Sequence, residues 1–575
     1  MTMEAPSKFA QLPAELLLKI LDETDNRGVL SCTDLSPFLR TVGVDILLRR
    51  HNVPDPSAYC EVQAIVPGCL SQPPLPDALS ALLSSNRRYP DIKHLYCTIR
   101  PPQEYDEFFH QRDPEEISFM WGDDPLPQKP LSKRLELTFN RLGQLLARVE
   151  VVGEVTIRVL DWRAFPVCFS NLLEGFIHAI IRSGCTSLQL QCPRVPFKGK
   201  LWSFPAPFEP PPPRGLNLSS MFSTLCGFLG SSASQRSRAG HLRLGSTSSA
   251  FPALHPRITK LDIDSTFFHP SAMHWTSNLL RHSPITELTV SSKDSLSWPW
   301  FPSEGIAAIL EGVPRLQSLS LLEFDAQDIQ DIAPRLRPFT ALKNLRLISL
   351  KGYCLPQDFG EGAATPFCPS NLERLSISPR IIGYMLLGTL TALNLKEIEI
   401  MHETSDMFDA QRIVDGVAAV RQFFDKIQAP ISIAVTLACH VHRILPNQGD
   451  TGVDRGMFLR NNFAVSLAKD LEATKTRNQV NPPRVDTLSL ELYPSALCNL
   501  NSDNVGIILD LIGFFEGLKK VAVGGVKDFR IAQSHRQTRV PEVAKAILQP
   551  AFSRCRGLTS MWIGEDEYLR PLVEI

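Results

Sequence analysis

The chain has 575 residues, of which 43% are hydrophobic and 21% charged, a composition typical of globular protein rather than of disordered or fibrous chains. The net charge of −1 excludes a general attraction to nucleic acid or to an anionic membrane. No apolar run is long enough to span a bilayer, and the 13 cysteines include no C-x-x-C pair that would indicate a zinc site. The first apolar cluster is interrupted by Lys19 and lacks a cleavage site, so we expect no secretory signal and a cytoplasmic or nuclear protein with reduced thiols.

Residues 8–51 are the first predicted unit, a small helical module. Pro13 is predicted at the first position of a helix, where its missing N–H removes no hydrogen bond. Leu12, Leu16 and Ile20 lie four residues apart on one face of that helix. Because so short a module buries its apolar residues poorly, we expect this face to need a partner surface.

The second half of the module completes a predicted three-helix stretch. A break is expected at residues 25–28, followed by an apolar step that ends at Leu35. Ser36 and Pro37 then suit the N-cap and the first position of a helix that runs to about Arg50.

This N-terminal pattern resembles an F-box, the helical module that joins a substrate receptor to the Skp-type adaptor of a cullin-RING ubiquitin ligase. The resemblance implies that the adaptor binds the apolar residues that match the F-box pattern. These residues are Leu12, Pro13, Leu16, Ile20, Leu21, Leu30, Leu35 and Leu39. The alternative is that the same helices only cap the first repeat of the domain that follows, as terminal units often do.

Residues 52–91 are predicted to be a proline-rich connector, because their prolines forbid long regular structure. A short helix is expected at residues 77–86. The first strand of the following domain is predicted to begin near Ile92, and an acidic, proline-rich loop is expected at residues 101–130.

One six-residue pattern recurs from Ile92 onward. It consists of an apolar residue, two mostly polar residues, an apolar residue, a mostly polar residue and a final apolar residue. The last three positions have the period of a half-buried strand. The pattern starts at Ile258, Ile285, Leu316, Leu342, Leu372, Leu395, Val485, Leu518 and Leu558, with looser copies at Ile92, Val152 and Cys185. Strands and helical links that alternate at about 20–40 residues resemble leucine-rich repeats. The resemblance covers residues 92–575 and implies an α/β fold, an irregular solenoid with a curved parallel sheet.

Helical links are predicted between these strands. They cover residues 271–282, 303–312, 328–336, 381–393, 408–427, 505–515 and 543–552. A further strand is expected at 431–440, followed by a loop at 445–456 and a helix that ends near 471. Residues 193–256, which contain a proline tract and a serine tract, are predicted to be an insertion with a helical stretch at 216–229. A proline-rich ligand for an aromatic groove is the alternative there.

No catalytic constellation is apparent, and the sequence predicts no cofactor and no metal. Gly524 and Gly525 follow a strand but lack the rest of a phosphate loop. His440 and His442 share a strand face without a third ligand in the nearby sequence. His269 is five residues from its nearest histidine neighbour, which does not fit a metal-binding helix.

The remaining candidates are polar residues between the buried positions of the strands. In an alternating strand these residues face away from the core, and in a solenoid they line the concave side. They are Asp262, Asp264, Thr289, Ser320, Arg346, Arg374, Ser376, Glu397, Glu399 and Ser489. Their mixed charge suits a protein partner better than a phosphate backbone.

Together these patterns predict a substrate-recognition subunit of an SCF-type ubiquitin ligase, with no enzymatic activity of its own. The F-box-like module would bind the Skp-type adaptor and, through it, the cullin scaffold. The repeats would hold an unknown protein substrate for ubiquitin-dependent degradation. The alternative is a protein-interaction scaffold without a ligase connection, and a third class is an enzyme hidden in the solenoid.

Overall fold

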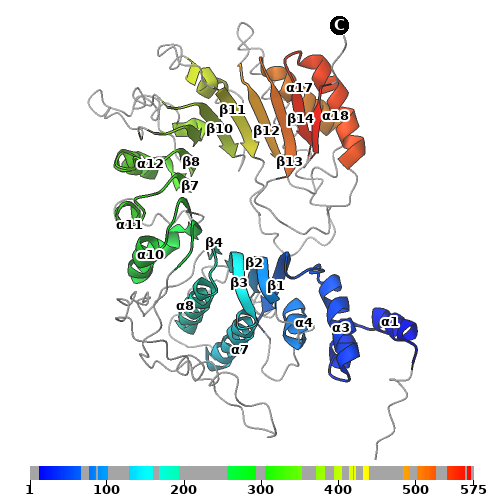
Figure 1. Cartoon of the computed structure of the whole chain (residues 1–575). Coiled ribbons are helices and arrows are strands. Elements are labelled where there is room, and N and C mark those ends of the chain that lie inside the picture. The colour runs from blue at the N-terminus through cyan, green and yellow to red at the C-terminus, as the bar shows by residue number, and fades with distance from the viewer. Residues whose placement is uncertain are drawn as a thin grey trace, which may run out of the picture.

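The computed structural model describes residues 12–66, 77–85, 89–100, 128–159, 167–192, 256–292, 305–351, 369, 371–381, 394–403, 413–418, 420–421, 432–438, 484–492, 502–525, 540–563 and 566–570. Within them the chain forms one open sheet of 15 strands whose spatial order is the sequence order. Figure 1 shows the strands along the inner side of an arc and the helices along its outer side.

The strands alternate with helices along most of the chain. The strands are β1 (Tyr59–Ile65), β2 (Tyr89–Arg100), β3 (Val149–Val159), β4 (Ser187–Gln191), β5 (Lys260–Asp264), β6 (Glu287–Ser291), β7 (Ser318–Asp325), β8 (Asn344–Lys351), β9 (Arg374–Ile377), β10 (Glu397–Glu403), β11 (Ser432–Ala438), β12 (Thr487–Leu492), β13 (Lys520–Gly525), β14 (Ser560–Ile563) and β15 (Asp566–Leu569). The helices are α1 (Ala14–Glu23), α2 (Asn26–Cys32), α3 (Pro37–Arg50), α4 (Ala78–Ser84), α7 (Gln128–Leu146), α8 (Val167–Arg182), α10 (Pro270–His282), α11 (Ile306–Gly312), α12 (Ala326–Ile332), α17 (Ser502–Phe514) and α18 (Val540–Arg554), with 3-10 turns η2 (Ser265–Phe268), η4 (Ala333–Leu336) and η6 (Pro379–Ile381).

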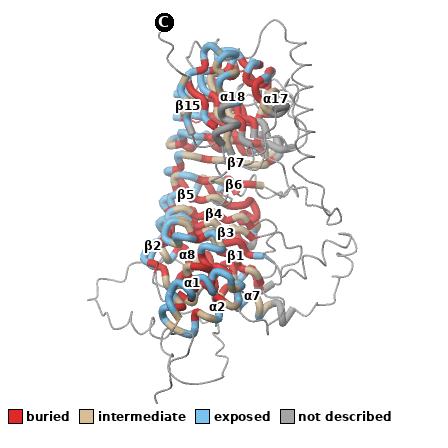
Figure 2. Tube along the Cα trace, turned by 90° about the vertical axis from the view of Figure 1, so that its right-hand side faces the viewer, coloured by how far each residue is buried: buried red, intermediate tan, exposed pale blue. Residues whose placement is uncertain are grey.

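Two ladders of buried apolar side chains run through the sheet from β2 to β10. In each ladder the pairing register places an apolar residue of one strand directly beside its counterpart on the next. The first ladder is Leu95, Val155, Leu188, Leu261, Leu288, Leu319, Leu345, Leu375 and Ile398. The second is Cys97, Ile157, Leu190, Ile263, Val290, Leu321, Leu347, Ile377 and Ile400. None of these side chains is more than 2% exposed, and Figure 2 shows buried residues at every level of the stack.

Backbone hydrogen bonds fix the register where each strand begins. The carbonyl of Thr259 accepts two N–H groups of the next repeat, from Thr286 at 2.8 Å and Glu287 at 3.0 Å. The carbonyl of Gln317 does the same for Lys343 at 2.8 Å and Asn344 at 2.9 Å. These carbonyls belong to the first polar position of the repeated pattern. The same position of the pattern therefore sets the register between successive strands.

The structure confirms the α/β class and the largely parallel sheet, but the sheet begins earlier than predicted. β1 lies inside the segment that we predicted to be a connector, residues 52–91, and it pairs in parallel with β2. Its buried residues Cys60, Val62 and Ala64 alternate with half-buried ones, the period of a strand. The prolines of this segment lie outside β1, so they limit the length of the strand without preventing it.

The last strand also differs from the prediction, because β15 is antiparallel to β14. Only two residues separate β14 from β15 in the sequence, which is enough for a hairpin and too few for a parallel crossover.

Several predictions lie outside the described residues. They are the insertion at 193–256 except for its last residue, the helical stretch at 216–229, the loop at 101–130 except for residues 128–130, which belong to α7 instead, the helix at 381–393 except for Ile381, the loop at 445–456, the helix that follows it, and the His440–His442 pair. Of the helix predicted at 408–427, residues 413–418 and 420–421 are described and are helical.

A half-buried histidine joins two of the outer helices. The indole Nε1 of Trp275 on α10 donates a hydrogen bond of 2.9 Å to Nε2 of His178 on α8. Since Nε2 accepts this bond, the imidazole is neutral in the folded protein. Burial, together with the nearby charge of Arg182, lowers the pKa of His178 from 6.5 to about 4.

We expect truncation of a ladder residue to destabilise the sheet. Leu345→Ala removes a fully buried side chain and should lower the free energy of unfolding by about 2–5 kcal/mol. Leu137→Ala is the matched control, because Leu137 is 47% exposed on α7 and should change stability little. Urea unfolding of both variants tests this, and equal midpoints would contradict the ladder.

The lowered pKa of His178 predicts a stability that depends on pH. A base whose pKa is lower in the folded state stabilises fully above its unfolded pKa of 6.5, and this contribution is lost as the pH falls toward about 4. The stability difference between wild type and His178→Gln should therefore shrink by about 2 kcal/mol between pH 7.5 and pH 5. Urea unfolding at both pH values measures this change, and a constant difference would refute the neutral imidazole in the folded protein.

Candidate functional site

Helix α1 presents one apolar face to its own module and another to solvent. Leu17 and Leu21, four residues apart, are buried. Leu16 is 49% exposed and Ile20 is 42% exposed, and this pair lies on the adjacent face. Figure 2 shows α1 at one end of the stack, where much of its surface is exposed. The structure therefore leaves uncovered one of the two apolar faces that the sequence offers.

The predicted adaptor-binding residues divide into three groups. Leu16, Ile20, Pro13 and Leu35 are exposed, with Leu35 at 67%. Leu12 and Leu30 are half-buried. Leu21 and Leu39 belong to the core, which corrects their assignment as contact residues, since they hold the three helices together instead.

Two exposed apolar residues were not among the candidates. Leu18 on α1 is 39% exposed, and Phe38 in the first turn of α3 is 49% exposed. The signal for Leu18 is the run of three leucines from Leu16, because consecutive residues of a helix point in different directions. We call Leu16, Leu18, Ile20, Leu35 and Phe38 the N-terminal apolar surface.

Side-chain caps define the second and third helices. The Asp25 carboxylate accepts the N–H of Gly28 at 2.7 Å and so starts α2 at Asn26, inside the break expected at residues 25–28. The Ser36 hydroxyl accepts the N–H of Leu39 at 3.1 Å, and Pro37 follows as the first residue of α3, as predicted. Pro13 precedes α1 instead of opening it.

Arg50 at the end of α3 fixes the end of α1. Its Nη2 donates to the carbonyls of Leu21 at 3.0 Å and Asp22 at 2.7 Å. Its Nη1 donates to the carbonyl of Thr24 at 2.8 Å and to Oδ1 of Asn26 at 2.9 Å. The carbonyls at the end of a helix have no partners within it, so the guanidinium satisfies groups that α1 leaves open. The position of the N-terminal apolar surface therefore depends on Arg50.

The module is joined to the sheet through α4. α3 packs against α4, and α4 packs against α7. Asp77 caps α4 by accepting the N–H of Ser80 at 2.7 Å, and Arg141 of α7 donates to Oδ1 of Asp77 at 2.9 Å. At the other end, Arg148 donates to the carbonyls of Leu83 at 2.6 Å and Ser85 at 2.8 Å. Both ends of α4 are thus held by arginines that belong to the sheet domain.

The predicted substrate-binding residues come together on the sheet face opposite the helices, which we call the inner face. The register places Asp262, Thr289, Ser320 and Arg346 side by side on β5, β6, β7 and β8. Ser376 and Glu399 continue this row on β9 and β10. Arg374 and Glu397 pair in the neighbouring row two residues earlier. With strands about 4.8 Å apart, the row from β5 to β10 spans roughly 24 Å.

Asp264 is a correction, because it is buried rather than outward-facing. It is 3% exposed, and its carboxylate accepts the N–H of Cys192 at 2.6 Å and the hydroxyl of Ser291 at 2.9 Å. Asp264 ends β5 and η2 follows at once, so the alternation of the strand no longer applies there. Its carboxylate ties β5 to its two neighbours along the sheet.

Polar networks occupy both flanks of the inner face. On one flank Thr156 donates to Gln189 at 3.0 Å, and Gln189 donates to Asp262 at 2.7 Å. On the other flank Glu399 accepts hydrogen bonds from Ser376 and Thr436, both at 2.6 Å.

Arg374 adds to the second network. It lies 3.3 Å from Glu397 and 3.4 Å from Glu399. The Glu399 side chain is only 15% exposed, so its carboxylate is largely used within the sheet. Glu397 and Arg374 are more open to a partner.

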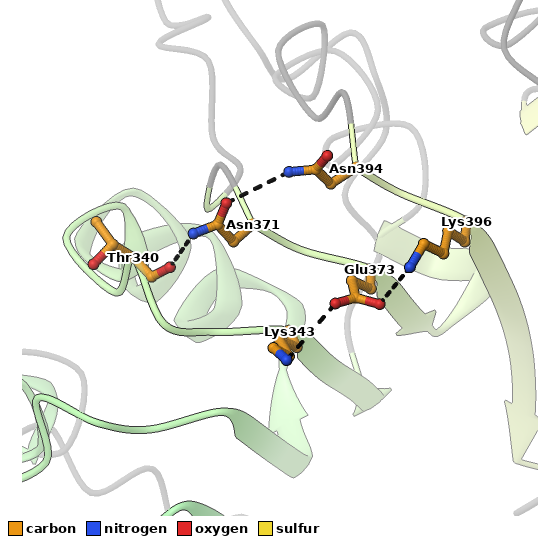
Figure 3. A network of polar contacts seen from close by, with 6 residues as sticks. All are labelled: Thr340, Lys343, Asn371, Glu373, Asn394 and Lys396. Carbon is orange, nitrogen blue, oxygen red and sulfur yellow. Dashed lines mark hydrogen bonds and ion pairs between the residues drawn. The ribbon is translucent and has the colours of Figure 1, made fainter.

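A third network joins the loops that lead into β8, β9 and β10, as Figure 3 shows. Glu373 lies between two lysines, 2.7 Å from Lys396 and 4.0 Å from Lys343. The hydrogen bond from Lys396 lowers the pKa of the Glu373 carboxyl. Asn371 donates to the carbonyl of Thr340 at 2.7 Å. Because these groups are exposed, the network adjusts the surface charge more than the stability.

The described residues hold no sign of a metal site, a membrane span or a reactive thiol among Cys60 and Cys185. Within the ranges given above, no three His, Cys, Asp or Glu side chains stand close enough to bind a metal. No described helix combines the length and the apolar character that a bilayer crossing needs. Burial raises the pKa of the Cys60 and Cys185 thiols to about 12, so both are protonated and unreactive near neutral pH.

Neither a known protein family nor a curated protein sequence matches this chain.

Loss of the Arg50 guanidinium should loosen α1. Arg50→Ala removes four donated hydrogen bonds, and we expect the amides of α1 to exchange with deuterium at least about tenfold faster, while the ladder strands keep their protection. Arg49→Ala is the matched control, because the Nε of Arg49 only contacts the Asp45 carbonyl of its own helix, at 3.4 Å. Hydrogen exchange with mass spectrometry measures the exchange rates of the α1 amides in both variants. Equal rates in the two variants would contradict the role of Arg50.

Proposed function

We propose that this chain is the substrate-recognition subunit of an SCF-type ubiquitin ligase. The N-terminal helices bind a Skp-type adaptor, and the inner face of the sheet holds a protein substrate. The observation that carries the proposal is the N-terminal apolar surface, which the rest of the described chain leaves open. Its place at one end of a long sheet, with strands in sequence order, supports the predicted combination of an F-box-like module and leucine-rich repeats.

The size of this surface suits a specific interface. Covering one large aliphatic side chain contributes about 1.5–3 kcal/mol. Covering the exposed parts of Leu16, Leu18, Ile20, Leu35 and Phe38 can offset part of the loss of translational and rotational freedom on association, which is roughly 4–15 kcal/mol. Leu16, Ile20 and Leu35 belong both to the N-terminal apolar surface and to the residues that match the F-box pattern.

The packing of α3 against α4 supports a fixed geometry between the two proposed binding surfaces. Because the module is fixed to the sheet through α4, an adaptor on α1 and a substrate on the inner face would be held at a set separation. Ubiquitin transfer belongs to other subunits of such a ligase, so this chain would contribute proximity and orientation. This role places the protein in the cytoplasm or the nucleus.

One observation favours the alternative, a repeat scaffold whose N-terminal helices only cap the sheet domain. Ile46, Leu47 and Leu48 of α3 are buried, and α3 packs against α4, which is what a cap requires. A cap has no need of exposed leucines on α1, however, so the two functions differ in what they predict for Leu16 and Ile20.

Charging this face should separate the two functions. In the full chain, Leu16→Asp with Ile20→Asp should reduce co-purification of a Skp-type adaptor at least about a hundredfold, since two exposed aliphatic contacts are replaced by desolvated charges. Quantitative pull-down with the purified adaptor measures the loss.

Leu137→Asp is the control for this experiment, because Leu137 on α7 is 47% exposed and lies outside the N-terminal module. It should bind the adaptor as the wild type does. Both variants should melt at the wild-type temperature, since neither changes a buried residue. Wild-type adaptor binding by the double variant, or no binding by the wild type, would favour the cap.

A further inference from the structure

The middle of the inner face differs from its two flanks. This stretch consists of polar side chains on β6, β7 and β8. Among the described residues, none of these side chains forms a hydrogen bond or an ion pair with another side chain. We call this stretch the central polar patch, and its members are Thr289, Ser318, Ser320, Asn344 and Arg346. The flanking networks around Asp262 and Glu399 consist of side chains that satisfy one another.

Arg346 is the cation of this patch, and it is poorly satisfied. Its Nε is buried and has no hydrogen-bond partner in the described structure. Its neighbours in the register are Ser320 and Ser376, and the Ser376 hydroxyl already donates to Glu399. A buried donor that lacks a partner is destabilising and is uncommon in folded proteins, so its presence requires an explanation.

The patch has the chemistry of an anion site. A guanidinium presents a planar fork of donors that matches two oxygens of a carboxylate or a phosphate. Ser320 lies on the adjacent strand, about 4.8 Å away, so its hydroxyl can donate to the same anion. Asn344 and Ser318 add donors one step along the same two strands.

We propose that the central polar patch binds one acidic group, a carboxylate or a phosphate, on the protein segment that the inner face receives. The inference rests on the proposed function only in assuming that this face receives a protein. It adds the class of substrate, a segment with an anionic residue at the position that meets Arg346.

The surroundings of the patch favour a protein segment over a nucleic acid. Carboxylates stand on both sides, with Asp262 and Glu287 toward β5 and β6 and Glu397 toward β10. A nucleic acid along the row would bring several phosphates against these carboxylates. A protein segment with one anionic residue would place its charge at Arg346 and neutral or basic residues on the flanks.

The test uses the full chain and immobilised libraries of nine-residue peptides, random except for a fixed central residue. The fixed residue is glutamate, phosphoserine, glutamine or serine, and the retained protein is quantified. The wild type should be retained at least tenfold better by glutamate or phosphoserine peptides than by their neutral counterparts. The stronger of the two arms identifies the anion as a carboxylate or a phosphate.

The variant Arg346→Gln should lose this preference. Arg337→Gln removes the same charge from an exposed residue at the end of η4 and should keep it. Equal retention on all four libraries, or an unchanged preference in Arg346→Gln, would overturn the proposal. Retention on single-stranded DNA that depends on Arg346 would overturn the choice of a protein partner.

Two further measurements keep the result unambiguous. The melting temperature of Arg346→Gln should equal or exceed that of the wild type, because an unsatisfied donor is removed; a clear decrease would show a structural role and overturn the proposal. Adaptor binding by Arg346→Gln should be unchanged, since the patch lies far along the chain from α1. A wild type that prefers acidic peptides but does not bind the adaptor would refute the ligase role alone and leave this inference standing.

Discussion

Apolar contact between equivalent positions of successive strands is the interaction on which the rest of this structure depends. No single strand and helix can cover its own apolar side chains, so each repeat is stable only against its neighbours. Ladder residues such as Leu319 and Leu345 lie side by side and are excluded from water. The shared carbonyls at Thr259 and Gln317 keep the repeats in register, which lets the ladders continue despite loops of very different length.

The ladders also decide what the other face of the sheet can do. Because side chains alternate along a strand, burying two apolar residues turns the residue between them toward the inner face. Those polar residues either satisfy one another, as Ser376 and Glu399 do, or remain open, as at Arg346. A rigid sheet of this kind presents polar groups at fixed spacings, which is a suitable basis for recognising an extended segment of another protein.

The N-terminal helices follow a different constraint. Three short helices have too little interior to bury every apolar residue, and α3 uses its buried residues to join α4. Arg50 holds α1 by the carbonyls at its end, which stabilises the helix without covering its outer face. Leu16 and Ile20 are therefore exposed although α1 itself is held in place.

Sequence alone determined the strand positions from Ile92 to β14, the α/β class, the cap at Ser36 and the row of outward polar residues, because all of these follow from local periodicity and capping chemistry. It did not reveal β1, where prolines obscured a strand. Only the tertiary structure decided which face of α1 is buried, since residues 16 and 20 are as apolar as residues 17 and 21 and the choice depends on α3. It also decided that Asp264 is buried and that Nε of Arg346 has no hydrogen-bond partner in the described structure. These outcomes depend on which side chains of distant strands meet, and periodicity within one strand carries no information about that.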